Sequence, residues 1–188
     1  KGHPEVIGTM GQLPEGNIKL IETEKDAQNL KIGEFSKPVA YVTQTTLSVD
    51  DTKNIVKILN KKFPDIKSSI KEDICYATTN RQNSVKKIAP KCEIFFVIGS
   101  ENSSNSKRLV EVAKKSGCNK SELFDFSKKF PISEIIKHKT IGLTSGASAP
   151  EKLIQDFISE VKKHSDVLIE EIVTTEEKVT FKLPKSLD

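Results

Sequence analysis

Apolar residues gather in three short runs along the chain, and each run is followed by a polar loop and then by a segment with apolar residues every three or four positions. Continuous runs of this length are typical of buried strands, whereas the longer spacing is typical of amphipathic helices. The pattern therefore predicts three strand–loop–helix units. Their runs occupy 38–42, 94–98 and 140–143, their loops 43–48, 99–106 and 144–150, and their helices 50–63, 107–117 and 151–161.

A fourth and weaker unit lies between the first two. Ile70 to Cys75 predicts a strand, residues 76–82 a polar turn, and Val85 with Ile88 the apolar face of a helix. Strands that alternate with helices indicate an α/β protein, here with repeated strand–loop–helix subdomains and small, mostly parallel sheets.

The repetition also predicts how the chain is divided. We expect one α/β subdomain in residues 1–71, a second in residues 72–164 and a tail in residues 165–188. Polar and apolar residues alternate in the tail from Glu170 to Leu183, which predicts a short strand or hairpin at its exposed edge.

Composition excludes several classes of protein. Of 188 residues, 36% are hydrophobic and 30% charged, as in soluble globular proteins, and no apolar run approaches the ~18 residues of a membrane span. The net charge is only +4, all but two of the 30 basic residues are lysines, and aromatic residues make up 6%, which argues against nucleic-acid binding. The chain opens at Lys1 without a Met or signal peptide, so we expect a processed or excised N-terminus.

The loops of the predicted units are rich in Ser, Thr, Asn and Gly. In parallel sheets the loops after the strands lead into helix N-termini, where free N–H groups and a partial positive charge favour phosphate. The chain has neither GxGxxG nor GxxxxGK[ST], so a small phosphate ester fits better than a dinucleotide. The same residues are also good N-caps, and Ser148 is predicted to cap the helix that has Pro150 in its first turn.

Three cysteines, without CxxC spacing, make a disulfide scaffold unlikely and are ordinarily buried apolar residues. Chain direction separates them. Cys75 lies at the carboxyl end of its predicted strand, whereas Cys92 and Cys118 precede strands and belong at the opposite edge. Because ligands bind at the carboxyl edge, Cys75 is expected to lie near the polar loops.

Histidine and glutamate add candidate acid–base chemistry near the start of the chain. His3 and Glu5 lie two residues apart and could deliver protons, although an exposed pair on a loop is the plainer interpretation. His138 and His164 lie among lysines and are expected at the surface.

Five segments, in order and spanning nearly the whole chain, resemble the 4-hydroxy-3-methylbut-2-enyl diphosphate reductase family, the iron–sulfur enzymes that end the non-mevalonate isoprenoid pathway. They are GHPEVIGTMGQ (2–12), TQTTLSVDDT (43–52), DICYATTNRQ (73–82), GSENSSNS (99–106) and GASAP (146–150).

The resemblance implies a pseudo-symmetric fold of three α/β subdomains around a [4Fe-4S] cluster, held by one Cys from each subdomain. Cys75 matches the third ligand, and Cys92 and Cys118 match none. The other two ligands belong upstream of Lys1, so the chain resembles the second and third subdomains, with the N-terminal subdomain missing.

The resemblance also implies roles for individual residues. Glu5 resembles the proton donor for the departing hydroxyl, Thr45 the residue that binds that hydroxyl and relays the proton, and His3 a member of the same network that contacts the phosphate end. The implied reaction is reductive loss of water, which gives isopentenyl and dimethylallyl diphosphate with electrons from a ferredoxin or flavodoxin. The residues that resemble diphosphate binders are Ser103, Ser104, Asn105 and Ser148.

Two other interpretations stay open because only one Cys matches. The chain could be a non-enzymatic phosphate-ester-binding module or an inactive fragment without the cluster, or it could be a structural half of a heteromeric assembly. The Lys bias and the start of the chain favour a plastid-type organelle such as an apicoplast over the bacterial cytoplasm.

Overall fold

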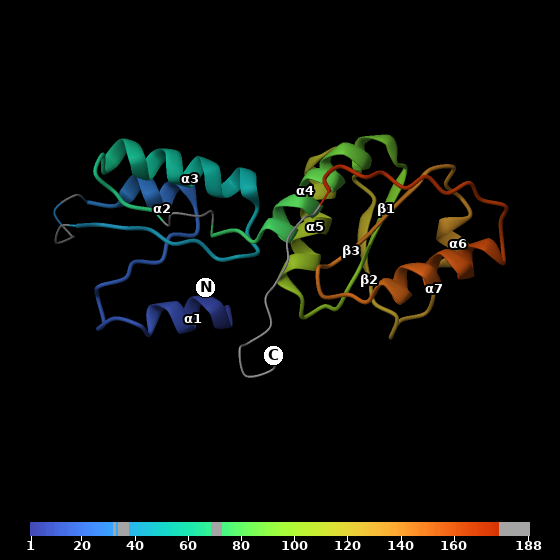
Figure 1. Ribbon diagram of the computed structural model, residues 1–188, viewed down its shortest axis with the longest axis horizontal. Coiled ribbons are helices and arrows are strands. Elements are labelled where there is room, and N and C mark those ends of the chain that lie inside the picture. Colours follow the sequence, from blue (N-terminus) through green and yellow to red (C-terminus); the bar gives the residue numbers. More distant parts are fainter. Residues whose placement is uncertain (32, 34–37, 69–72, 177–188) are drawn as a thin grey trace, which may run out of the picture.

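The computed structural model describes residues 1–31, 33, 38–68 and 73–176. Among the residues described before Ser68, the chain forms the helices α1, α2 and α3 and almost no sheet; after Asp73, strands alternate with helices around a small sheet (Figure 1). The elements are α1 (Pro4–Met10), α2 (Glu24–Asn29), α3 (Val49–Lys62), α4 (Tyr76–Ile88), the 3-10 turn η2 (Ala89–Lys91), β1 (Ile94–Ile98), α5 (Ser104–Lys115), β2 (Ser121–Phe124), α6 (Ile132–Ile135), β3 (Ile141–Ser145) and α7 (Glu151–Lys162).

The three strands form one parallel sheet in the order β2-β1-β3. At its carboxyl edge, Ile98 of β1 is paired with Phe124 of β2 and with Ser145 of β3. The loops that follow all three strands therefore leave the sheet at the same edge. The predicted α/β class with a small parallel sheet is confirmed.

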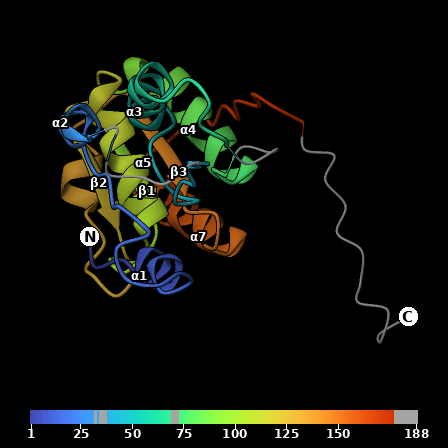
Figure 2. The same cartoon turned by 90° about the vertical axis from the view of Figure 1, so that its left-hand side faces the viewer.

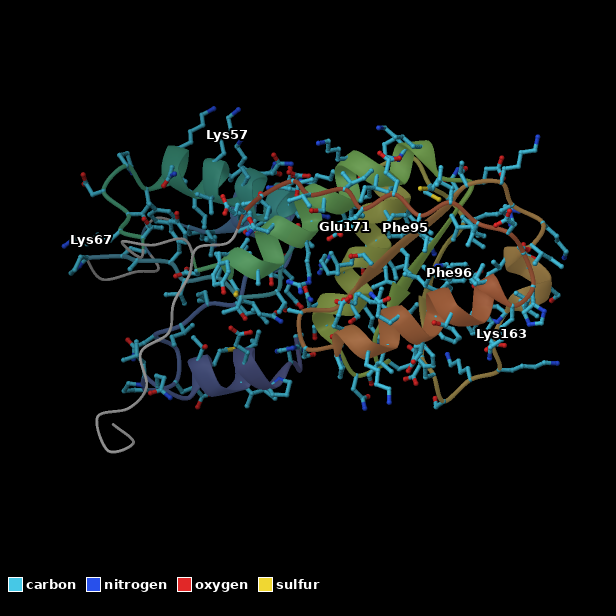
Figure 3. The ribbon with its side chains drawn as sticks, turned by 45° about the vertical axis from the view of Figure 1, so that its right-hand side comes forward. Lys57, Lys67, Phe95, Phe96, Lys163 and Glu171 are labelled. Atoms are coloured by element: carbon cyan, nitrogen blue, oxygen red, sulfur yellow. The ribbon has the colours of Figure 1, made fainter. Side chains whose placement is uncertain are left out.

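The sheet is covered on both faces, which explains why β1 is apolar throughout. Phe95 and Val97 pack with residues of α4 and α5 in one buried cluster, whereas Phe96 packs with residues of α6 and α7 in another. Figure 3 labels Phe95 and Phe96 among the side chains around the sheet. A strand buried on both faces needs an uninterrupted apolar run, and all five residues of β1 are buried.

The part before Ser68 is organised around α2 and α3, which pack side by side and bury Ala27, Leu59 and Phe63. Figures 1 and 2 show α1 apart from this pair. The strand predicted at 38–42 is wrong: only Ala40 forms a bridge, with Lys67, and the Val42 side chain is 65% exposed. An apolar run extends a sheet only where a partner strand runs alongside it for several residues.

Two further predicted strands lie partly outside the described residues. In the run from Ile70 to Cys75, residues 69–72 lie outside the described residues, Asp73 and Ile74 form a bend, and Cys75 is the N-cap of α4. In the tail, residues 165–176 contain no strand, and the rest of the predicted hairpin lies outside the described residues. The division at residues 71 and 164 stays a prediction.

No helix in the described parts of the chain has both the length and the apolar character needed to span a bilayer.

Candidate functional site

His3 joins the start of α1 to the start of α5. It is the N-cap of α1, and its Nδ1 accepts a hydrogen bond from the backbone N–H of Glu5 at 3.2 Å. Its Nε2 lies 2.8 Å from Ser104 Oγ. Because Nδ1 accepts, the neutral ring carries its proton on Nε2 and donates it to Ser104. Residues that are 101 positions apart in the sequence are thereby in direct contact.

The Glu5 carboxylate faces Thr45. Its Oε1 accepts from the Thr45 backbone N–H at 3.1 Å, and its Oε2 accepts from the Thr45 hydroxyl at 3.3 Å. Both contacts are exposed, so this carboxyl group is accessible to a ligand. The pair has the geometry needed to pass a proton between a carboxyl group and a hydroxyl group.

We use the name Thr45 loop for residues 43–48 together with Val49, the first residue of α3. This loop is hydrogen-bonded to the start of α4. The backbone N–H of Cys75 donates to the Thr45 carbonyl at 3.1 Å, and the Thr43 N–H donates to Asp73 Oδ2 at 2.8 Å. A continuous series of hydrogen bonds therefore runs from Cys75 through Thr45, Glu5 and His3 to Ser104.

Cys75 is an exposed free thiol at the N-cap of α4, and no side chain caps that helix. The free N–H groups at the start of α4 and the positive end of the helix dipole can attract an anion to this place. Cys92 precedes β1, and Cys118, which is 1% exposed, precedes β2. The structure bonds Cys75 to the Thr45 loop, as expected from the predicted position near the polar loops, but the described residues before it form a bend and not a strand, so the separation of the cysteines by sheet edge stays a prediction. Burial, and then the nearby Cys118, raise the pKa of Cys92.

The first turn of α5 contains a buried amide without a partner. Ser103 is the N-cap, and its hydroxyl accepts from the backbone N–H of Ser106 at 3.2 Å. Asn105 is 7% exposed, yet neither its Nδ2 nor its Oδ1 has a hydrogen bond. Among the described residues, the one other buried side-chain oxygen or nitrogen without a hydrogen bond is the Oγ1 of Thr79, in the first turn of α4. Buried polar atoms without partners are costly, so these groups at the starts of α4 and α5 are candidate contacts for a ligand.

Ser148 lies on the loop after β3, at the same edge of the sheet. A Cβ added at Gly146 in this loop would lie 2.3 Å from Ser106 Oγ and 3.8 Å from Asn105 Nδ2, so the loop passes close to the start of α5. The prediction that Ser148 caps the following helix is wrong. Pro150 is the N-cap of α7, and no side chain accepts a hydrogen bond from the start of that helix.

The other two histidines lie away from these residues. His164 is exposed as predicted, but the His138 ring is only 8% exposed, so its assignment to the surface is wrong. Its Nδ1 lies 2.9 Å from the Glu134 carbonyl, and its Nε2 lies 3.1 Å from Lys120 Nζ. The flanking lysines extend outward while the ring packs beneath them.

Sequence reasoning missed Gln82 and Asp73, although both lie in a segment that was singled out. Gln82 is fully buried and bonds the Thr45 loop through both ends of its amide. Its position relative to the buried Thr78 and Val85, at helical spacing, was the available signal.

The described residues contain no group of three His, Cys, Asp or Glu side chains that could bind a metal ion. What this chain offers a cluster is one accessible thiol at a helix N-terminus, which suits one thiolate ligand.

Comparison with known proteins agrees with the resemblance. The profile of the family described as "LytB protein" matches residues 1–162. The chain is similar to the 4-hydroxy-3-methylbut-2-enyl diphosphate reductases of Roseobacter denitrificans, with 50% identity over 99% of this chain and 58% of that protein, and of Hyphomonas neptunium, with 51% identity over 99% and 59%. It therefore spans somewhat more than half the length of these relatives.

The fold is also similar to that of a solved structure, the E-1-hydroxy-2-methyl-but-2-enyl-4-diphosphate reductase from Plasmodium falciparum. The TM-score is 0.87 and the sequence identity is 36%. The match covers 100% of this chain and 58% of that chain.

Proposed function

The chain belongs to the LytB protein family, and from this premise we propose that the full-length protein reduces 4-hydroxy-3-methylbut-2-enyl diphosphate to isopentenyl and dimethylallyl diphosphate. The overall change adds two electrons and two protons and releases one water. The observation that carries the proposal is the series of hydrogen bonds from Cys75 through Thr45, Glu5 and His3 to Ser104.

A [4Fe-4S] cluster would be bound by Cys75 and by two thiolates from outside this chain. When bound, such a cluster supplies single electrons and a Lewis-acidic iron. The accessible thiol of Cys75 at the start of α4 supports this role. The proposal assigns the remaining chemistry to residues of this chain.

Glu5 is the proposed proton donor. Its Oε2 accepts from the Thr45 hydroxyl, so a proton held on this carboxyl group can reach a substrate hydroxyl through Thr45 Oγ1. Protonation converts hydroxide into water as the leaving group. His3 orients Glu5 by accepting from its backbone N–H, and it is bonded to Ser104 on the diphosphate side.

Four residues at the carboxyl edge of the sheet are proposed to bind the diphosphate. The unpaired Asn105 amide supplies a donor, and the start of α5 adds free N–H groups and a partial positive charge. Binding the distant diphosphate would fix the allylic alcohol beside Glu5 and Thr45. The four residues are Ser103, Ser104, Asn105 and Ser148.

An acidic ferredoxin or flavodoxin is the proposed electron donor, and the lysine-rich surface supports such a partner. Lys57 on α3 and Lys163 beyond α7 are two of these exposed side chains (Figure 3). The location stays a proposal, either a plastid-type organelle or the bacterial cytoplasm.

A pair of variants in the full-length protein tests this proposal. Glu5→Gln removes the proton and should lower kcat by roughly 10²–10⁴-fold while pyrophosphate binds as in the wild type. Asn105→Ala removes a donor to a charged group and should weaken pyrophosphate binding by about 10-fold or more, with the cluster retained.

The two measurements are kcat per cluster and the dissociation constant of pyrophosphate by calorimetry. Near-normal turnover in Glu5→Gln would remove Glu5 from the mechanism. Unchanged pyrophosphate affinity in Asn105→Ala would move the diphosphate to another part of the protein.

A further inference from the structure

Gln82 lies two turns along α4 from Cys75 and is 0% exposed. A fully buried polar side chain needs partners for all of its hydrogen-bonding groups. Its Nε2 donates to the Leu47 carbonyl at 2.8 Å, and its Oε1 accepts from the Val49 backbone N–H at 3.0 Å. The amide therefore bonds the end of the Thr45 loop as a neighbouring strand would.

The two backbone groups that Gln82 bonds lie where the Thr45 loop becomes α3. Val49 is the first residue of α3, so its N–H has no acceptor within the helix. The N-cap Ser48 accepts from Asp51 instead, which leaves the Val49 N–H to Gln82. One side chain of α4 thus fixes where α3 begins and where the Thr45 loop ends.

The other end of the Thr45 loop is held from the same segment of the chain. Asp73 Oδ2 accepts from the Thr43 N–H, and the Cys75 N–H donates to the Thr45 carbonyl. Asp73 and Cys75 lie at or before the N-cap of α4, whereas Gln82 holds the loop from the helix interior. Moving the loop relative to the Cys75 thiol would therefore require breaking the two Gln82 bonds as well as those made by Asp73 and Cys75.

We propose that Gln82 is a positioning residue, which sets the distance between the Thr45 hydroxyl and the Cys75 thiol. The inference rests on the proposed function, since it assigns these two groups to the same reaction. Gln82 touches neither group and acts only through the backbone of the Thr45 loop. Its loss should therefore reduce turnover with little effect on substrate binding or cluster content.

The test compares Gln82→Met with a matched control in the full-length protein. Met has nearly the volume of Gln but forms neither hydrogen bond. Val85→Ala is the control, because Val85 is buried on the same helix and packs in the cluster with Phe95 and Val97. Gln82→Met should lower kcat per cluster by about 10- to 100-fold, with KM and iron content within about twofold of wild type.

A second readout does not depend on activity. Amide hydrogen exchange at Thr45, whose N–H is bonded to Glu5 rather than to Gln82, should accelerate in Gln82→Met and not in Val85→Ala. If Gln82→Met fails to fold, the shorter Gln82→Asn takes its place, because it keeps the amide but cannot reach both backbone groups.

A purely structural role makes the opposite prediction. Both variants would then lose stability, with equal kcat per cluster and unchanged exchange at Thr45, and that result would overturn the inference. A wild-type protein without reductase activity would instead contradict the proposed function. In that case the exchange measurement alone decides whether Gln82 positions the loop.

Discussion

The two parts of the molecule hold their site residues by different means. From Asp73 onward, a parallel sheet buried on both faces brings the loops that carry Ser103 and Ser148 to one edge. Before Ser68, the strand pairing of the described residues is limited to one isolated bridge, between Ala40 and Lys67. Glu5 and Thr45 in this part are held by hydrogen bonds between segments that are distant in the sequence.

The difference matches the tasks that we propose for each part. Backbone pairing and apolar packing give a fixed frame, which suits the binding of a diphosphate that does not react. Individual hydrogen bonds place a carboxyl group against a hydroxyl group and can break and re-form as a proton moves. The part with the sheet should therefore depend mainly on packing, and the other part on particular polar contacts.

The largest expected loss of stability comes from truncating a side chain in the hydrophobic core beside the sheet. Phe157 of α7 lies against Phe96, Phe124 and Phe130, with ring centroids 4.9 to 5.4 Å apart. Phe157→Ala should lower the free energy of unfolding by about 3–5 kcal/mol, because removing the large buried ring leaves a cavity among its aromatic neighbours.

Leu59→Ala in α3 is the matched change in the other part. Leu59 lies in a cluster that has only three buried residues among those the structure describes, and its side chain is smaller than the Phe157 ring. The cost should be smaller, about 2–3 kcal/mol, near the lower end for such changes. Urea unfolding of both variants measures the difference, and an equal or larger loss in Leu59→Ala would erase the proposed contrast.

Two glycines test the difference in packing between the two parts, because a change to alanine should lower stability at one of them and raise it at the other. A Cβ at Gly142 of β3 would lie 2.2 Å from Phe95 Cδ2 and 2.9 Å from Cys92 Sγ, whereas a Cβ at Gly8 of α1 would meet nothing within 4 Å. Gly142→Ala should destabilise the protein by about 1–3 kcal/mol through overpacking. Gly8→Ala should stabilise α1 by about 0.5–1 kcal/mol through helix propensity.

Thermal unfolding of both glycine variants checks the signs. A Gly142→Ala variant as stable as wild type would mean that the sheet is less tightly packed than the distances indicate.

The smallest effect concerns the exposed capping box of α2. Bonds from the Thr23 hydroxyl and from the N–H groups of Glu22 and Thr23 lower the pKa of Asp26. Because the folded-state pKa is depressed, the contribution to stability is present above the unfolded value of about 3.9 and is lost as the pH falls through the folded value. Asp26→Asn should therefore melt slightly earlier than wild type at neutral pH. If the difference in melting temperature between the wild type and Asp26→Asn does not become smaller at acid pH, the ionised Asp26 carboxylate is not the source of this stability.

The sequence predicts β1, β3 and the helices α3, α5 and α7 well, but it gives no bounds for β2 and wrongly predicts a strand at 38–42. The run at 94–98 is long enough and apolar enough to require burial on both faces, and it forms β1. The run at 38–42 has similar character but forms a single bridge, because periodicity shows what a segment prefers and not whether a partner lies beside it.

The candidate site was predictable in its residue types but not in its contacts. Polar loops at strand ends predicted an anion site, and chain direction predicted that Cys75 lies apart from Cys92 and Cys118, although the described residues before Cys75 form a bend and not a strand. The contact between Glu5 and Thr45 joins residues 40 positions apart, and no local pattern predicts it. Gln82 was missed because the pattern of apolar positions counts every amide side chain as polar. In the sequence, a buried Gln therefore looks the same as a solvent-exposed one.

The central claim is that a cluster binds at Cys75, whose backbone is bonded to the Thr45 loop, and not at Cys92 or Cys118. The most direct measurement is the broad absorbance near ~400 nm and the iron content of the full-length protein purified without oxygen. Cys75→Ser should abolish the absorbance, while Cys92→Ser and Cys118→Ser should retain it. A Cys75→Ser protein that keeps the chromophore, or a loss confined to Cys92→Ser or Cys118→Ser, would contradict the account.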